Sequence, residues 1–193
     1  ETIDGVIRVI DDPEISTLNL MEIIKGPDFP TGGIIYGKSG IISAYSTGKG
    51  IVRVRARTHI EGEDRKKIIV TELPYQVNKS ALIERIAELV RDGNLDGISD
   101  LRDESDRQGM RIVIELGKSA GGEDVLRQLL KRTQLQTTFS ITLLALVGNE
   151  PRLLTLKQAL RVYLDHRQVV VKRRSEYDLA KAKDRLHILE ALR

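Results

Sequence analysis

The chain of 193 residues contains no cysteine and no tryptophan, and phenylalanine occurs only twice. The lack of cysteine excludes disulfides, thiolate metal sites and a cysteine nucleophile, and it agrees with a reducing compartment. Aromatic residues make up 4% of the chain, so we do not expect a site that binds single strands by base stacking. No apolar run approaches the ~20 residues that span a bilayer. The sequence therefore predicts a cytoplasmic protein with an aliphatic core and no membrane partner.

Charged residues make up 31% of the chain and hydrophobic residues 40%, which is typical of a folded globular protein. The length predicts one ordinary domain with an appendage. The formal net charge is only +3, so a nucleic-acid role depends on where the charges lie. The chain starts without methionine, and an amphipathic pattern is already under way at Ile3. We expect both ends to be cut from a longer protein.

The first 25 residues predict two short helices. Apolar residues at helical spacing form one face of the first, at Ile3, Val6, Ile7 and Ile10, and Asp11 to Pro13 ends it. Ser16 is a suitable N-cap for the second helix. We expect that helix to end at Lys25, because Gly26 can adopt a left-handed cap and Pro27 cannot continue the helix.

The middle of the chain predicts an α+β domain. From residue 51 the period is two, so Val52, Val54 and Ala56 face one way while Arg53, Arg55 and Arg57 face the other. A polar turn at 61–64 leads to a strand at 68–70, which predicts an antiparallel hairpin. A helix then runs from the N-cap Asn78 to Gly93. Two more strands, at 98–102 and 110–116, precede a helix that carries apolar residues at 125, 126, 129 and 130. The order ββα–ββα predicts helices packed on a largely antiparallel sheet.

After a mixed stretch at 134–154, an uninterrupted helical pattern runs from Thr155 to the last residue. It corresponds to about 38 residues, or ~57 Å. Leu156, Tyr163, Val170 and Tyr177 are spaced by seven, and a second apolar set continues in a shifted phase. A helix of this length and pattern needs another helix to pack against, from a later segment or a second subunit.

The strongest candidate site is a group of cations on and near the strand that begins at residue 51. Alternation places three guanidinium groups on one face at steps of roughly 7 Å, which suits an anionic partner such as a duplex backbone. The candidate nucleic-acid-binding residues are Lys38, Lys49, Arg53, Arg55 and Arg57. The alternative is a solvated face, neutralised across the hairpin by Glu61, Glu63, Asp64 or Glu72.

Other constellations give no catalytic, cofactor or metal site. The acidic residues Asp100, Asp103, Glu104 and Asp106 are interspersed with arginines, which favours a turn over a divalent-metal site. The three histidines share no ligand spacing, and no nucleophile–base pair can be proposed. The glycines near residues 32–40 do not form a phosphate-binding loop.

Several long blocks resemble the DNA-gate subunit of bacterial gyrase and topoisomerase IV, the type II topoisomerases. These blocks occupy residues 26–31 (GPDFPT), 72–79 (ELPYQVNK), 97–106 (GISDLRDESD) and 133–136 (TQLQ). The likeness extends over essentially the whole chain and includes the segment 185–192. The region 133–146 favours the gyrase branch over its topoisomerase IV paralogue.

The resemblance implies a division of the chain into three parts. Residues 1–25 would be the end of a winged-helix domain, 26–154 a tower-like α+β domain, and 155–193 the first arm of a truncated antiparallel coiled coil. The tower would cradle duplex DNA beside the cleavage site, and the arm would connect the DNA gate to the exit gate. The family's catalytic tyrosine follows an arginine, and no Arg-Tyr pair occurs here. This piece alone would therefore break no DNA.

The resemblance also implies partners. They are the gyrase B subunit and a second copy of the A subunit, in an A2B2 assembly whose B subunits supply the ATP and Mg²⁺ sites for ATP-dependent supercoiling. An alternative interpretation of the residues is a stand-alone nucleic-acid-binding α+β module with a helical dimerisation arm. A zipper of that kind would self-associate in parallel, whereas a topoisomerase arm needs its returning helix.

Overall fold

The computed structural model describes residues 1–62, 66–107, 109–118 and 120–192. The chain forms two compact units. Unit 1 comprises Glu1–Lys25, Ala44–Lys49 and Thr142–Arg193, and unit 2 comprises Gly26–Ser43 and Gly50–Ile141. The fold class is α+β with antiparallel strand pairing, as the sequence predicts. Glu63 and Asp64, which the sequence offered as partners for the arginines, lie outside the described residues, as does Arg193.

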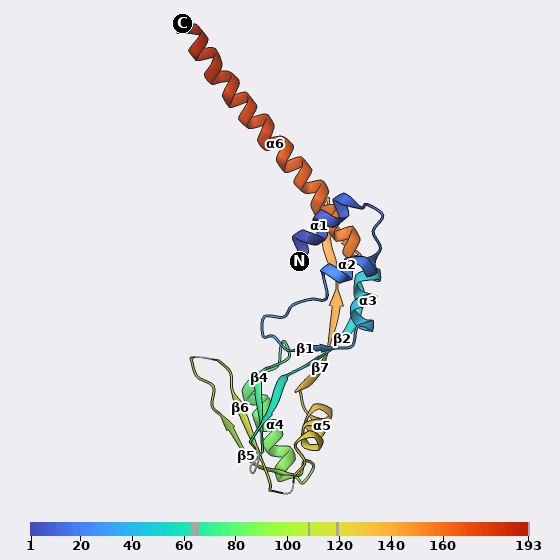
Figure 1. Ribbon diagram of the computed structural model, residues 1–193, viewed down its shortest axis with the longest axis vertical. Helices are drawn as coiled ribbons and strands as arrows, with labels where there is room; N and C mark the ends of the chain where they lie inside the picture. The colour runs from blue at the N-terminus through green and yellow to red at the C-terminus, as the bar shows by residue number, and fades with distance from the viewer. Residues whose placement is uncertain (63–65, 108, 119, 193) are drawn as a thin grey trace. The chain divides into compact units, whose positions relative to one another are not determined.

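Unit 2 is built on a four-stranded antiparallel sheet in the order β3-β4-β6-β5, with two helices against it (Figure 1). Its elements are β3 (Arg57–Glu61), β4 (Lys67–Glu72), α4 (Lys79–Arg91), β5 (Ile98–Asp103), β6 (Ile112–Leu116) and α5 (Gly122–Arg132). This succession confirms the predicted ββα–ββα order. Both helices and one face of the sheet contribute to a single aliphatic core, which includes Ile68, Ile86, Ile114 and Leu129.

Local sequence signals explain the ends of α4. The side chain of Asn78 accepts a hydrogen bond from the Ala81 amide at 3.0 Å, which satisfies one of the free amides of the first turn. At the other end Gly93 adopts a φ of 68°, a left-handed conformation that glycine tolerates best. Leu82, Ile86 and Leu89 are buried on the core side. The predicted cap, stripe and C-terminal glycine of this helix are all confirmed.

The predicted strand at 51–57 is in fact two strands in two sheets. β2 (Lys49–Arg55) lies between β1 (Ile34–Tyr36) and β7 (Gln136–Thr142), whereas Arg57 begins β3 and pairs with β4. The chain divides at Ala56, whose amide donates to the Leu135 carbonyl at 2.8 Å, and the β3–β4 register shifts just after Arg57. The expectation that Arg53, Arg55 and Arg57 share one face of one strand is therefore wrong for Arg57.

Unit 1 contains two short helices, a hairpin and the long helix: α1 (Thr2–Asp11), α2 (Thr17–Ile23), β8 (Leu144–Val147), β9 (Glu150–Leu153) and α6 (Leu156–Ala191). α1 contacts both α2 and α6. α1 packs closely against its neighbours at Gly5. A Cβ atom at this position would lie 2.7 Å from Ile24 Cδ1 and 3.6 Å from Leu160 Cδ1. Val6 and Val9 are buried, while Ile3, Ile7 and Ile10 of the predicted apolar face are more than half exposed.

Two further expectations about unit 1 and its neighbouring residues need correction. α2 ends at Ile23 rather than Lys25, and Gly26 does not adopt a left-handed conformation. A Cβ at Gly26 would approach Ile41 Cδ1 to 3.2 Å, so close packing rather than φ explains a small residue there. The stretch 134–154, which shows no clear pattern in the sequence, contains β7, β8 and β9. Leu144 and Leu146 of the hairpin are exposed, so its sequence does not show the alternation of apolar and polar residues that a half-buried strand has.

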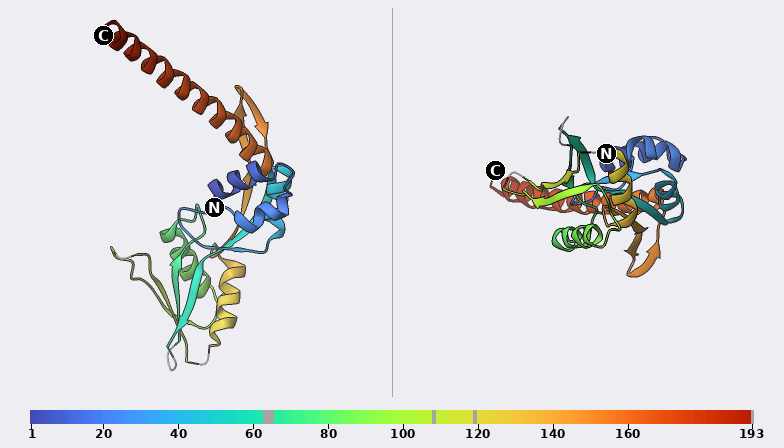
Figure 2. Two further views of the ribbon diagram at one scale, coloured as in Figure 1. Left: turned by 45° about the horizontal axis from the view of Figure 1, so that its top comes forward. Right: turned by 90° about the horizontal axis from the view of Figure 1, so that it is seen from below.

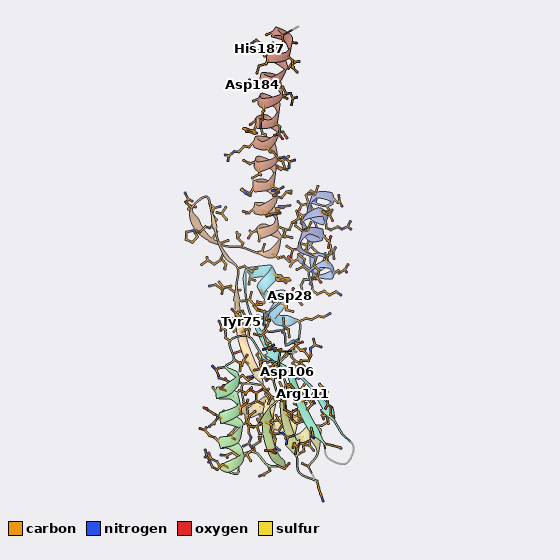
Figure 3. All side chains as sticks on the ribbon, turned by 90° about the vertical axis from the view of Figure 1, so that its left-hand side faces the viewer. Asp28, Tyr75, Asp106, Arg111, Asp184 and His187 are labelled. Atoms are coloured by element: carbon orange, nitrogen blue, oxygen red, sulfur yellow. The ribbon has the colours of Figure 1, made fainter. Side chains whose placement is uncertain are left out.

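The long helix α6 has the predicted extent within the described residues. It begins with a capping box, in which the Thr155 hydroxyl accepts from the Gln158 amide and the Gln158 side chain accepts from the Thr155 amide. Over its 36 residues only Leu160 is buried. Figure 2 shows the helix running beyond the rest of unit 1, and in Figure 3 side chains such as Asp184 and His187 project from it into open space. Among the described residues, no helix combines the length and apolar composition required to cross a membrane.

Candidate nucleic-acid interface

Arg53 and Arg55 lie on the same face of β2, over an aromatic ring from β1. The guanidinium carbon of Arg55 is 3.6 Å from the centroid of the Tyr36 ring, and that of Arg53 is 5.9 Å from it. The strand register causes this arrangement, because Tyr36 pairs with Arg53 across the β1–β2 ladder. The ring attracts cations through its face, so one tyrosine holds two arginines side by side.

Arg55 has a second support. Its Nε donates to the side-chain oxygen of Gln136 on β7 at 2.6 Å. Gln136 is neutral, so this bond orients the guanidinium and leaves its charge uncompensated. In the described part of the chain, neither Arg53 nor Arg55 forms an ion pair with a carboxylate.

Arg57 is in a different environment from the other two arginines. Its Nε lies 2.8 Å from Oε1 of Glu72 in an ion pair across the β3–β4 hairpin. The other oxygen, Oε2 of Glu72, accepts a hydrogen bond from the Gly33 amide at 2.6 Å. The Gly33 amide and, to a lesser degree, Arg57 hold the pKa of Glu72 below its ordinary value. The alternative of neutralisation across the hairpin thus describes Arg57, with Glu72 as the partner.

The two candidate lysines do not join the pair of arginines over Tyr36. Lys38 is exposed in the short segment between β1 and α3 (Ser39–Thr47), and its carbonyl accepts from the Ile42 amide. Lys49 is exposed at the start of β2, in unit 1, and its amide donates to the Thr47 hydroxyl at 3.3 Å. Of the five predicted residues, Arg53 and Arg55 are the two that lie beside the Tyr36 ring.

The outer face of the four-stranded sheet provides a contrast, because its arginines are matched by carboxylates. Arg102 lies within 3.4 Å of Asp100, Glu104 and Glu115, and Arg111 within 3.4 Å of Glu61 and Glu104. Figure 3 labels Arg111 beside the strands of this sheet. Ile69 and Val113 point toward this face and are nonetheless almost fully buried, as expected where the stems of long charged side chains cover apolar residues.

Three acidic residues of the 100–106 segment, Asp100, Asp103 and Glu104, also pair with cations. Lys79 at 2.7 Å is the main reason that the pKa of Asp103 falls to about 2, and bonds from Ser105 add to the effect. Asp100 pairs with Arg102 at 3.1 Å. These carboxylates bind side-chain cations of the sheet and of α4, and Asp100 and Asp103 lie in β5 rather than in the turn that the sequence favoured.

The Arg53/Arg55 face, rather than the outer face of the four-stranded sheet, is the candidate site. Evenly matched charges on the four-stranded sheet stabilise the fold and leave little attraction for an external anion. Arg53 and Arg55 instead repel each other, are fixed by a neutral amide and a phenol ring, and are flanked by exposed Ile34 and Ile51. An external polyanion would relieve that repulsion.

Contacts link the four sequence blocks described above to one another or to the strands of this face. Phe29, Tyr75 and Phe139 form an aromatic cluster with centroid distances of 5.0–5.9 Å, which joins the first two blocks to β7. The Lys79–Asp103 pair joins the second block to the third, and Gln136 of the fourth block holds Arg55. Tyr36 and Gln136 were not predicted as site residues. No local pattern distinguishes them, because their role depends on pairing between distant strands.

Comparison with known proteins agrees with the resemblance seen in the blocks. The family model for the A subunit of DNA gyrase/topoisomerase IV matches residues 1–193. The DNA gyrase A subunit of Clostridium acetobutylicum is 58% identical over 195 residues, and that of Halalkalibacterium halodurans is 57% identical over 194 residues. The corresponding protein of Staphylococcus epidermidis is 53% identical over 196 residues.

These matches cover 100% of this chain and 22–24% of the relatives, so the chain spans about a quarter of their length. A stand-alone module is therefore a poorer description than a part of a longer subunit. The family model and these relatives match every residue of the chain, and the relatives are more than half identical to it. The chain belongs to the family of DNA gyrase and topoisomerase IV A subunits.

Proposed function

We propose that the chain is the part of a type II topoisomerase DNA-gate subunit that binds duplex DNA beside the cleavage site. The observation that carries the proposal is the pair Arg53 and Arg55, fixed over Tyr36 without a carboxylate partner among the described residues. Sequence-independent affinity for duplex DNA comes mainly from cations that displace the counterions of the phosphates. Two guanidinium groups beside one aromatic ring meet this need, whereas Lys38, Lys49 and Arg57 would make weaker, peripheral contributions.

In this proposal the three parts of the chain keep the roles that the family implies. Residues 1–25 end a winged-helix domain, 26–154 form the tower, and 155–193 begin the arm that links the DNA gate to the exit gate. The exposed apolar residues of α6, such as Tyr177 and Leu186, support the last role, because they require a helix to cover them.

The parent assembly would be a cytoplasmic A2B2 heterotetramer with the gyrase B subunit, performing ATP-dependent strand passage and supercoiling. We assign ATP and Mg²⁺ to the B subunit. Among the residues that the structure describes, no three His, Asp or Glu side chains gather as a metal site would require. Lys79, Arg102 and Arg111 already pair with three carboxylates of the 100–106 segment, those of Asp100, Asp103 and Glu104.

Duplex binding can be tested by fluorescence anisotropy of the 193-residue chain over a series of salt concentrations. We expect weak, non-specific affinity on the order of 10⁻⁴ to 10⁻⁶ M near physiological salt. An Arg53→Gln/Arg55→Gln variant should lose about 1.8 units from the slope of log K against log salt, since each phosphate contact contributes about 0.9. Arg57→Gln should lose less, because Glu72 already neutralises Arg57.

The matched control removes two arginines from α4, as Arg85→Gln/Arg91→Gln. It changes the net charge equally but leaves the Tyr36 face intact, so its salt slope should stay near that of the parent chain. Circular dichroism would verify that each variant folds. Equal slopes for the parent, the Arg53/Arg55 variant and the control would contradict the proposed DNA face.

A further inference from the structure

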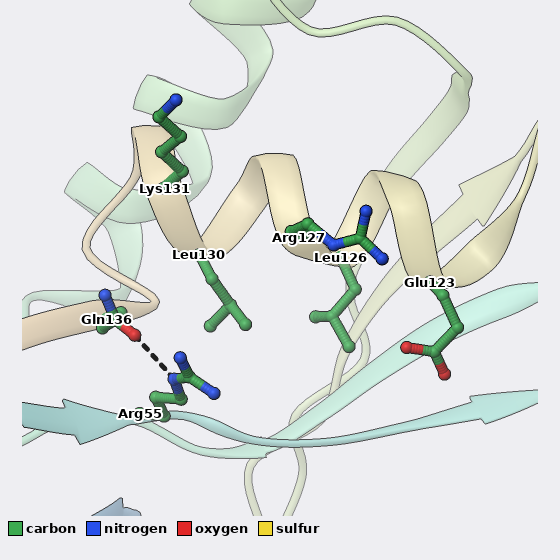
Figure 4. Close-up of a pocket in the computed structure, with 7 residues that line it drawn as sticks. All are labelled: Arg55, Glu123, Leu126, Arg127, Leu130, Lys131 and Gln136. Atoms are coloured by element: carbon green, nitrogen blue, oxygen red, sulfur yellow. Dashed lines mark hydrogen bonds between the residues drawn. The ribbon is translucent and has the colours of Figure 1, made fainter. Parts of the chain in front are cut away.

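A cleft of about 520 Å³ lies in unit 2 between α5 and the strands that carry Arg55 and Gln136. Figure 4 shows Leu126 and Leu130 pointing from α5 toward the strands, while Arg55 rises from β2 toward Leu130. The two leucines are half-buried, since their other side packs against the core of unit 2. The cleft therefore has an apolar floor that is continuous with the core of unit 2.

The charges that line the cleft are unbalanced. Arg55, Arg127 and Lys131 are cationic, and Glu123 is the single carboxylate among the described lining residues. Arg127 pairs with Asp124 at 3.2 Å, but both side chains are more than 70% exposed, so the pair is weak and leaves Arg127 available. Within the described residues the Lys131 ammonium has no ion pair or hydrogen bond, and Arg55 has only Gln136 and the Tyr36 ring.

We propose that this cleft holds the sugar–phosphate backbone of duplex DNA, as a continuation of the Arg53/Arg55 face. The inference rests on the proposed function and extends it to α5, an element that the sequence did not connect with DNA. Arg55 belongs to both surfaces: it lies over Tyr36 on the exposed side of β2 and also lines the cleft. A backbone bound at Arg53 would therefore meet Arg55 next and then the cations of α5.

The spacing of the cations favours an extended backbone over a compact anion. Arg127 and Lys131 are four residues apart on one helix, which separates them by about 6 Å along its axis. Successive phosphates of one B-DNA strand rise by roughly 3.4 Å along the duplex axis and lie further apart through space, so the two cations are spaced to reach different phosphates. A single phosphate would need the three cations to converge on one point, whereas here two lie along α5 and the third on β2. Deoxyribose can contact the leucine floor between the phosphates.

The first test is an Arg127→Gln/Lys131→Gln variant in the same anisotropy assay. Both residues are exposed on α5 and glutamine is compatible with a helix. If the cleft holds two phosphates, the slope of log K against log salt should fall by about 1.8 units. The control is again Arg85→Gln/Arg91→Gln on α4, which removes the same charge from a helix outside the cleft and should leave the slope near that of the parent chain.

The second test predicts a gain of affinity, which a folding defect cannot imitate. Glu123→Gln removes the only carboxylate among the described residues of the cleft, so DNA affinity at about 50 mM salt should rise on the order of threefold. Glu84→Gln on α4 makes the same change in net charge at an exposed site away from the cleft and should raise affinity less.

The outcomes separate this inference from the proposed function. One contrary result is a salt slope that falls for Arg53→Gln/Arg55→Gln and stays unchanged for Arg127→Gln/Lys131→Gln, with no rise in affinity for Glu123→Gln. That result would contradict DNA binding in the cleft and keep the Arg53/Arg55 face. No effect of any of these variants would overturn both. An equal loss in the α5 variant and the α4 control would mean that net charge alone governs binding, and it too would overturn the cleft.

Discussion

Glu72 connects three segments that are distant in the sequence. Its carboxylate accepts from the Gly33 amide at 2.6 Å and pairs with Arg57 at 2.8 Å, while its backbone ends β4. Gly32 must be small there, because a Cβ at its φ of 71° would lie 2.3 Å from Glu72 Oε2. Glu72 thus anchors the turn that leads into β1. Tyr36, which supports the two arginines, lies on that strand.

Replacement of Glu72 by glutamine should lower the free energy of unfolding by about 1 kcal/mol, because two charge-assisted bonds become weaker neutral ones. The measurement is the midpoint of urea unfolding, followed by circular dichroism. Glu88→Gln is the matched control, since Glu88 pairs with the exposed Arg85 on the surface of α4. Its effect should stay below about 0.5 kcal/mol. Equal midpoints for parent and Glu72→Gln would contradict the anchoring role.

Among the secondary-structure elements, the four-stranded sheet depends most on ionised carboxylates. Its outer face carries matched rows of charge in place of a second layer of helices. Arg111 lowers the pKa of Glu61, with help from His59, and Lys67 lowers that of Glu115, with help from Arg102. Each of these shifts favours the charged form in the folded chain, so protonation should weaken the sheet.

Asp103, which pairs with Lys79 at the start of α4 on the side of the sheet that the helices cover, gives a pH range for the loss of such ionised pairs. Its pKa is about 2 in the folded chain against an ordinary value of 3.8, so between these values the unfolded state binds more protons. The stabilisation by Asp103 should be fully present above pH 3.8 and lost as the pH falls toward 2. Glu61, Glu72 and Glu115 act in the same direction, starting from 4.5.

Urea midpoints measured from about pH 6 down to about pH 2 would detect this decline. The Asp103→Asn variant should be less stable than the parent at the upper end and should approach it at the lower end, where the parent has lost the same interaction. Asp96→Asn, at an exposed position outside the charge network, should reproduce the steeper decline of the parent chain. Parallel curves for the parent and Asp103→Asn would show that the Lys79–Asp103 pair has no net effect on stability.

Considered as a whole, the molecule distributes its burial unevenly along the chain. Ile68, Ile69 and Val70 of β4 have no exposed surface, whereas nearly every side chain of α6 after Leu160 is exposed or half-exposed. Local opening is easiest where few apolar contacts must be broken. The two regions should therefore differ widely in the stability of their backbone hydrogen bonds.

Hydrogen exchange followed by mass spectrometry would measure this difference. Peptides from β4 and β6 should stay protected for hours, while those from residues 171–192 should exchange within minutes at low protein concentration. Protection of the arm that appears only as the concentration rises would reveal self-association through its exposed apolar residues. Slow exchange of the arm at every concentration would contradict the prediction.

The extent of each helix could be predicted where local signals decide it. Asn78, Gly93 and the Thr155–Gln158 pair act within one turn, so the ends of α4 and the start of α6 can be read directly. The same reasoning gave the wrong end for α2, because Gly26 is small for packing rather than for its φ. The family assignment could also be made from the sequence, since it depends on long ordered blocks of residues.

The sequence by itself determined the α+β class, the ββα–ββα order, the long helix and the presence of a basic strand, because all of these follow from periodicity and local capping. Only the tertiary structure decided which arginines act together. Alternation cannot show that the chain changes sheets at Ala56, that Glu72 neutralises Arg57, or that Tyr36 and Gln136 hold Arg55. These contacts join residues up to 81 positions apart, and their pairing is fixed by strand register and core packing, which no local stretch of sequence contains.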